Sequence, residues 1–113
     1  MVKINENKVA CFIHSTHMDV WKHELLYMLL KHIITSGLVD KLDFIYINNI
    51  GIPLDSKFIC NLHKKIVLEN YSRELTLFEN YTIRSIHQFS KLHPDYKILY
   101  LHTKGVSYQK DHE

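Results

Sequence analysis

Apolar residues in this chain follow two alternating patterns, short unbroken runs and longer segments with a three- or four-residue period. The short runs are bounded by polar or turn residues and are rich in β-branched and aromatic side chains, which is typical of β-strands. We therefore expect strands over Lys8–His14, Asp43–Ile47, Lys65–Glu69 and Tyr96–Leu101. Pro94 precedes the last run, whose apolar residues are too few for a helix, and we expect this strand to be buried on both faces.

The first periodic segment predicts a long helix that ends at Gly37, a natural C-terminal glycine. Thr16 and Asp19 resemble a weak capping pair near its start, where an acidic side chain also suits the helix dipole. Residues 38–41 then form a connector to the second strand. The apolar face of this helix is expected to comprise Val20, Trp21, Leu25, Met28, Leu29, Ile33 and Ile34.

A second helix is expected over Glu79–Leu92, and the turn that follows it leads into the last strand. Two other segments remain ambiguous. Residues 57–62 fit either a short helix or a turn, and residues 73–78 fit either a loop or a first helical turn. The inner side of the second helix is expected to comprise Ile83, Ile86, Gln88 or Phe89, and Leu92.

The resulting order, β-α-β-β-α-β, predicts an α/β protein with a Rossmann-like, mostly parallel sheet of about four strands and helices on both faces. With 113 residues, the chain is long enough for a single domain over residues 1–113. A terminal strand of such a sheet leaves an edge exposed, through which the protein could self-associate or pair with a partner.

Composition narrows the class of protein. The formal net charge is only +2 and acids alternate with bases, which argues against nucleic acid or an anionic membrane as a partner. The two cysteines, Cys11 and Cys60, supply neither a disulfide framework nor a zinc quartet. No apolar signal segment or membrane span is evident, so a cytoplasmic location is expected.

Polar residues follow three of the expected strands, at 14–16, 48–49 and 102–105. The carboxyl ends of parallel strands meet at one edge of a sheet, where ligands of α/β proteins bind. The last group, His102 to Gly105, offers an imidazole, a hydroxyl, an ammonium and a glycine, which suits a phosphate-bearing ligand. An ordinary loop with a solvated Lys104 explains the same residues, and it is favoured from composition alone.

Common nucleotide and metal motifs are missing from the sequence. No GxxxxGK precedes a helix and no GxGxxG follows the first strand, so the sequence lacks the main signatures of a P-loop and of a Rossmann dinucleotide site. His23-Glu24 begins like a zincin helix, but Tyr27 occupies the position of the second histidine. His14 and His17 could share a metal, although a hydrogen-bonding role for His14 fits the sequence better because no third ligand is near.

Longer segments of the chain resemble a known family. WKHELLYMLLKHIITSGLVD, IYINNIG, ENYTI and YKILYLHTKG together resemble the N-terminal half of a GT-A-like glycosyltransferase family found in large DNA viruses and bacteria. The most specific feature is YLHTKG at Tyr100 to Gly105, and the family's Glu-x-x-Thr-Leu segment is similar to Glu79 to Ile83, with isoleucine in place of leucine. The resemblance covers the chain from Val9 to Tyr108.

The resemblance implies a transferase that binds a nucleotide-diphosphate sugar, such as a UDP-sugar, at the carboxyl edge and transfers the sugar to an unknown glycan or protein acceptor. Mg²⁺ or Mn²⁺ would bridge the diphosphate, but the chain has no Asp-x-Asp motif, so neither metal ligands nor catalytic residues can be assigned. The residues implied to bind the donor are His14, Ser15, Thr16, Asn48, Asn49, Glu79, Thr82, His102, Thr103, Lys104 and Gly105.

Family members continue beyond the HTKG run, often through an Asp-Trp-Arg segment into acceptor-binding elements. The sequence is therefore expected to represent an incomplete domain, the nucleotide-sugar-binding half of the fold. A non-catalytic α/β remnant or interaction module is the alternative.

Overall fold

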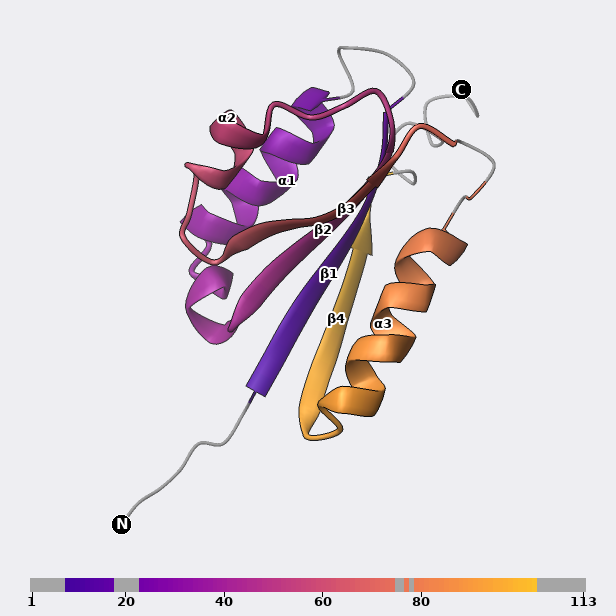
Figure 1. Ribbon diagram of the computed structural model, residues 1–113. Coiled ribbons are helices and arrows are strands. Elements are labelled where there is room, and N and C mark those ends of the chain that lie inside the picture. The colour runs from indigo at the N-terminus through magenta and orange to yellow at the C-terminus, as the bar shows by residue number, and fades with distance from the viewer. Residues whose placement is uncertain (1–7, 18–22, 75–76, 78, 104–113) are drawn as a thin grey trace, which may run out of the picture.

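Four parallel strands form one sheet in the computed structural model, which describes residues 8–17, 23–74, 77 and 79–103 (Figure 1). The strands are β1 (Lys8–His17), β2 (Phe44–Gly51), β3 (Ile66–Ser72) and β4 (Tyr96–His102). Their order across the sheet is β3-β2-β1-β4, and each neighbouring pair is parallel. β1 therefore lies inside the sheet, between the second and the last strand of the chain.

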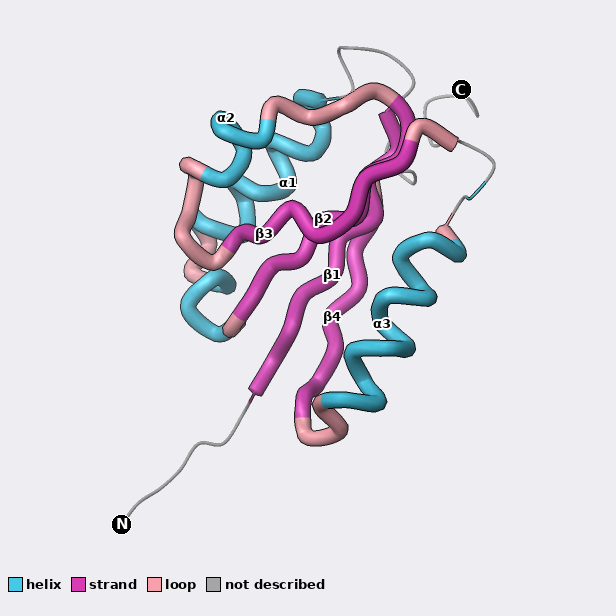
Figure 2. The backbone as a smooth tube through the Cα atoms, in the orientation of Figure 1, coloured by secondary structure: helices cyan, strands magenta, loops and turns pink. Residues whose placement is uncertain are grey.

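Helices cover both faces of the sheet, which confirms the predicted α/β fold class (Figures 1 and 2). α1 (His23–Thr35) and α2 (Ser56–Cys60) lie on one face, and α3 (Asn80–Leu92) lies on the other. The expected connector after α1 is a 3₁₀ helix, η2 (Leu38–Lys41). Gly37 precedes it with a φ of 89°, a left-handed conformation that glycine adopts without a steric penalty.

The face covered by α1 and α2 has an aliphatic core. Alternate strand residues point to the same face, so Cys11 and Ile13 of β1 meet Ile45 and Ile47 of β2 there. Burial of the Cys11 thiol raises its pKa to about 12, so it packs as a small neutral apolar group. Further buried members of this core are Leu26, Leu30, Ile33, Val39, Leu42, Ile59 and Ile66.

The face covered by α3 has an aromatic core instead. The Phe12 ring of β1 lies 5.0 Å from the Tyr46 ring and 5.4 Å from the Phe89 ring of α3, between ring centroids. Phe89 also meets Tyr96 of β4 edge to face at 5.2 Å. These contacts fasten α3 across β1 and β4, because aromatic pairs in this geometry add to the burial of their surfaces.

All four strands extend further than predicted, β4 by His102 alone. β1 continues to His17, β2 continues through residues 48–51, and β3 continues through residues 70–72. Polar residues predict the ends of these strands too early, because the sheet ladder uses backbone groups and the polar side chains are hydrogen-bonded to other elements. Thr16 is accordingly a strand residue and not a helix cap, and Asp19 lies outside the described residues.

The structure also corrects several burial predictions. β4 is an edge strand with half-buried side chains, so it is not buried on both faces. On α1, Leu26 and Leu30 reach the core and Met28 is 63% exposed, while Val20 and Trp21 lie outside the described residues. On α3, Ile83 and Leu92 are exposed.

Within the described ranges, no helix combines the length and the apolar character needed to cross a membrane.

Candidate functional site

The carboxyl end of β1 contributes a deeply buried polar side chain to the α3 face. His14 is 1% exposed, and its two ring nitrogens both meet threonine hydroxyls. Nδ1 lies 2.7 Å from Oγ1 of Thr82, which is fully buried in the first turn of α3. Nε2 lies 3.1 Å from Oγ1 of Thr16, two residues further along β1. Residues that lie two apart on a strand share a face, so His14 and Thr16 both point toward α3.

β4 ends beside His14. It pairs with β1 on the side opposite β2. His102 is the register partner of His14 and is exposed, and the next residue, Thr103, is buried and donates its backbone N–H to the His14 carbonyl at 3.2 Å. The chain runs from β1 outward through β2 and β3, whereas β4 lies on the opposite side of β1. The sheet order therefore reverses between β1 and β4, and this point is the place where ligands bind in open α/β sheets.

Glu79 lies near this point as well. Its Oε1 atom accepts a hydrogen bond of 2.9 Å from the Tyr100 hydroxyl of β4. Burial raises the pKa of the Tyr100 phenol well above its usual range, and the hydrogen bond to Glu79 and its negative charge add to this shift. Lys104 and Gly105, the last two predicted residues, lie outside the described residues.

Asn48 of β2 is the centre of a second polar cluster on the α3 face. Its Nδ2 group donates to Glu69 Oε1 at 3.2 Å, and its Oδ1 atom accepts from Asn70 Nδ2 at 2.6 Å and from Ser85 Oγ of α3 at 3.3 Å. A register shift opposite Asn48 pairs it with Asn70 and leaves Glu69 as an extra residue in β3. This bulge brings both β3 side chains to the same asparagine.

Asn49 points to the opposite face of the sheet. Its Oδ1 atom accepts a hydrogen bond of 2.9 Å from Ser15 Oγ, and its Nδ2 group donates to the Ile52 carbonyl at 3.0 Å. Ser15 and Asn49 are both buried, so they anchor the loop between β2 and α2 to the central strand. The two predicted asparagines thus serve different faces.

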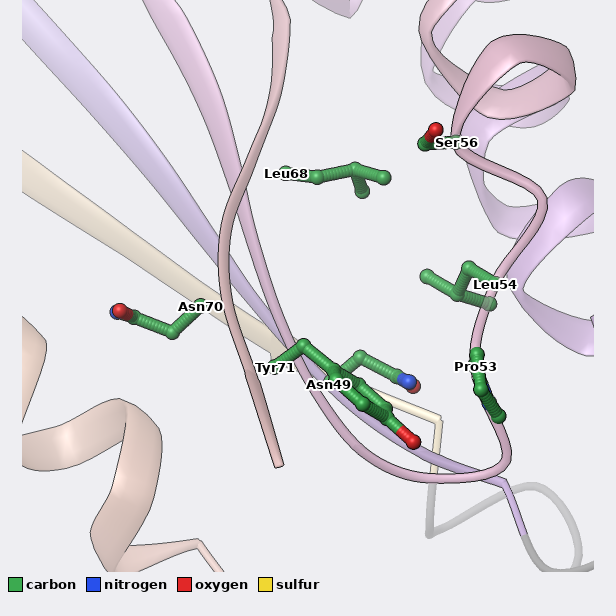
Figure 3. A pocket seen from close by; sticks show the side chains of 7 residues that line it. All are labelled: Asn49, Pro53, Leu54, Ser56, Leu68, Asn70 and Tyr71. Atoms are coloured by element: carbon green, nitrogen blue, oxygen red, sulfur yellow. The ribbon is translucent and has the colours of Figure 1, made fainter. Parts of the chain in front are cut away.

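A pocket of about 230 Å³ opens beside this loop (Figure 3). Leu68 and Leu54 point toward each other across it, whereas the Asn70 side chain turns away to the other side of the sheet. The remaining lining residues are Asn49, Pro53, Ser56 and Tyr71. Its walls are mainly apolar, which suits a flat organic ring more than a phosphate.

Sequence reasoning left part of this arrangement unassigned. Glu69, Asn70, Tyr100 and Ser85 are not among the site residues that the sequence predicts. Ser85 follows Thr82 by three positions, so helical spacing alone places the two hydroxyls on one face of α3. Among the described residues, no group of three or more His, Cys, Asp or Glu side chains is arranged to hold a metal ion.

Glu69 provides a prediction for pH dependence. Desolvation raises the pKa of its carboxyl, against the smaller opposing effect of the Asn48 hydrogen bond. In the window between the unfolded and the raised folded pKa, the native state holds more protons than the unfolded state, so its stability falls as pH rises. Glu69→Gln keeps an acceptor for Asn48 and removes the charge.

Urea unfolding of both proteins between pH 4 and pH 7 measures this effect. We expect wild-type stability to fall more steeply over this interval than that of Glu69→Gln. Parallel curves for the two proteins would contradict the assignment to Glu69.

Fold and site together define a Rossmann-like α/β protein with a polar carboxyl edge. A family model described as Domain of unknown function (DUF8361) matches residues 10–113, so the chain belongs to this family. No curated protein and no solved structure matches the chain.

Proposed function

We propose that this protein is a GT-A-like glycosyltransferase domain that binds a nucleotide-diphosphate sugar at the carboxyl edge of its sheet and transfers the sugar to a glycan or protein acceptor. The observation that supports it best is the reversal of strand order between β1 and β4, where His14, Thr82 and Thr103 gather. This is where open α/β sheets bind nucleotides. The resemblance of Tyr100 to Gly105 to the YLHTKG run of these transferases points to the same place.

The donor would lie across the ends of β1, β2 and β4. Backbone and hydroxyl groups of residues 13–16 and the Asn48 region would meet the nucleoside, as the resemblance implies. His102 and Thr103 lie next to His14 at the end of the sheet, and the sequence places Lys104 immediately after them, where its charge would stabilise the leaving diphosphate.

The described residues do not fit a metal site at this edge. Glu69 and Glu79 at this edge already accept hydrogen bonds from Asn48 and Tyr100 and belong to separate clusters, and among the described residues no three His, Cys, Asp or Glu side chains are grouped to hold a metal ion. We therefore derive no step through Mg²⁺ or Mn²⁺.

Thermal unfolding with and without UDP tests the donor site. A ligand that binds only the native state stabilises it by RT ln(1 + [L]/Kd), about 2.7 kcal/mol at a hundredfold excess over Kd. We expect the melting temperature to rise with UDP concentration, in the presence and in the absence of Mn²⁺ tested separately. If UDP, ADP and GDP all leave the melting temperature unchanged, the donor site is wrong.

A lysine pair gives the matched control. Lys104→Ala is expected to weaken UDP binding, whereas Lys97→Ala removes an exposed lysine at the opposite end of β4 and should leave it unchanged. Release of UDP from UDP-sugars, measured with the wild-type chain, reports on transfer separately from binding.

A further inference from the structure

The His14 ring connects two hydroxyls that come from different parts of the fold. One belongs to Thr82, which is fully buried in the first turn of α3, and the other belongs to Thr16, which is half-buried near the carboxyl end of β1. The distances of 2.7 Å and 3.1 Å make Thr82, His14 and Thr16 a continuous hydrogen-bonded chain from the interior to the edge of the sheet.

The buried end of this chain fixes the direction of its protons. A hydroxyl that is 0% exposed must donate its proton to an acceptor, because an unsatisfied buried donor is costly. Within the described ranges, the Thr82 hydroxyl has His14 Nδ1 as its hydrogen-bond partner. Nδ1 is therefore the acceptor, and a neutral His14 ring carries its proton on Nε2.

The outer end of the chain follows from this tautomer. The Nε2–H group of His14 donates to Thr16 Oγ1. The Thr16 hydroxyl is therefore the acceptor in this bond, and its own O–H group can donate to another acceptor. Resting on the proposed function, we infer that Thr82 and His14 are positioning residues which turn the Thr16 hydroxyl into a hydrogen-bond donor for an acceptor oxygen of the bound nucleotide. Diphosphate oxygens and base carbonyl oxygens share this chemistry.

The opposite tautomer would give the opposite selectivity. With the proton on Nδ1, the Thr16 hydroxyl would donate to the ring and offer only lone pairs to a ligand. The hydrogen bonds from Thr82 through His14 thus determine whether the Thr16 hydroxyl binds a hydrogen-bond acceptor or a donor of the ligand. Thr82 itself is buried too deeply to contact the ligand.

The tautomer is measured directly by ¹⁵N NMR of the histidine ring nitrogens in the ligand-free protein. His14→Gln assigns the His14 signals among the nine histidines. We expect the Nε2-protonated form in the wild type and in Thr82→Ser, and a loss of this preference in Thr82→Val, which keeps the shape of threonine but has no hydroxyl. A wild-type ring protonated on Nδ1 would overturn the inference.

Binding of UDP tests the consequence for the ligand. We expect Thr16→Val and Thr82→Val each to weaken UDP binding roughly fivefold to tenfold, the usual effect of one hydrogen bond. The Thr→Ser variants at both positions keep the hydroxyl and should bind within about twofold of wild type. Uridine and inorganic pyrophosphate, titrated separately, identify which acceptor oxygen is lost.

Binding measurements distinguish a failure of the positioning role from a failure of the proposed function. If the wild type binds UDP and both valine variants bind it equally well, the positioning role is wrong and the donor site stands. If the wild type binds no nucleoside diphosphate, the proposed function is wrong together with the role of Thr16 toward a nucleotide. Should Thr82→Val fail to fold, the tautomer of His14 in the wild type and in Thr82→Ser still tests the positioning role, and Thr16→Val at the half-buried position tests the contact with the nucleotide.

Discussion

Phe12→Ala is expected to destabilise the protein by about 3–5 kcal/mol, the usual cost of deleting a buried phenylalanine. The Phe12 side chain is fully buried and joins Tyr46 of β2 to Phe89 of α3. Its loss leaves a cavity under the only helix that covers this face within the described residues. Such a loss is a large fraction of the stability of an ordinary domain, and urea unfolding measures it.

Phe58→Ala is the matched control. Phe58 is 52% exposed on α2, where it stacks against Tyr27 at 5.4 Å. We expect a loss of about 1 kcal/mol or less, because only a partly exposed aromatic pair is removed. Equal losses for the two variants would mean that the aromatic core does not hold α3 on the sheet.

Asn48→Asp is expected to cost about 3–5 kcal/mol at pH 7, the range found when a buried charge lacks a partner. The substitution keeps the shape of the side chain but replaces the amide group that donates to Glu69 at 3.2 Å with a carboxylate oxygen. The new carboxylate, at a position that is fully buried, would then face the carboxylate of Glu69, which lies at the exposed side of β3. Their repulsion raises the pKa of the pair and favours a shared proton.

The sign of the pH dependence distinguishes this mechanism from a packing defect. The folded variant binds a proton more tightly than the unfolded chain, so the loss should shrink as pH falls toward 4. Asn80→Asp, at the exposed first position of α3, provides the control and should be neutral or slightly stabilising. A loss for Asn48→Asp that is constant between pH 4 and pH 7 would contradict the charge mechanism.

The number and the parallel direction of the strands were predictable because each strand contains an apolar run. Their ends were not, since residues such as Asn48 and Asn70 read as turn formers in the sequence. Their side chains bond to each other and to α3, across distances of 22 and 37 residues along the chain. No local pattern contains that information, so the polar ends of the strands looked like loops.

The helix faces show a related limit. On α1, apolar residues occur in adjacent pairs, Leu25-Leu26 and Leu29-Leu30. The helical period is therefore clear, but the sequence does not tell which leucine of each pair is buried. The structure buries Leu26 and Leu30 most deeply. On α3, Phe89 was correctly placed as one of two alternatives, whereas Thr82 takes a buried position that an apolar pattern does not reveal.

Parallel topology also predicted that polar strand ends would meet at one edge of the sheet. It could not predict which side chains pair. The contact between His14 and Thr82 joins residues that are 68 apart in sequence, and it depends on where along β1 the helix α3 packs. Ser15 and Asn49 turned out to face the other side of the sheet, which follows from strand alternation once the register is known.

The placement of β1 between β2 and β4 also shapes how the chain folds. β1, α1, β2, α2 and β3 follow one another in sequence as neighbours in space, so they can assemble through local steps. β4 must instead return to the first strand of the chain, and closing that long loop carries the largest entropic cost of the three strand pairings. We therefore expect the β1–β4 pair, and with it the junction beside His14, to be completed last during folding.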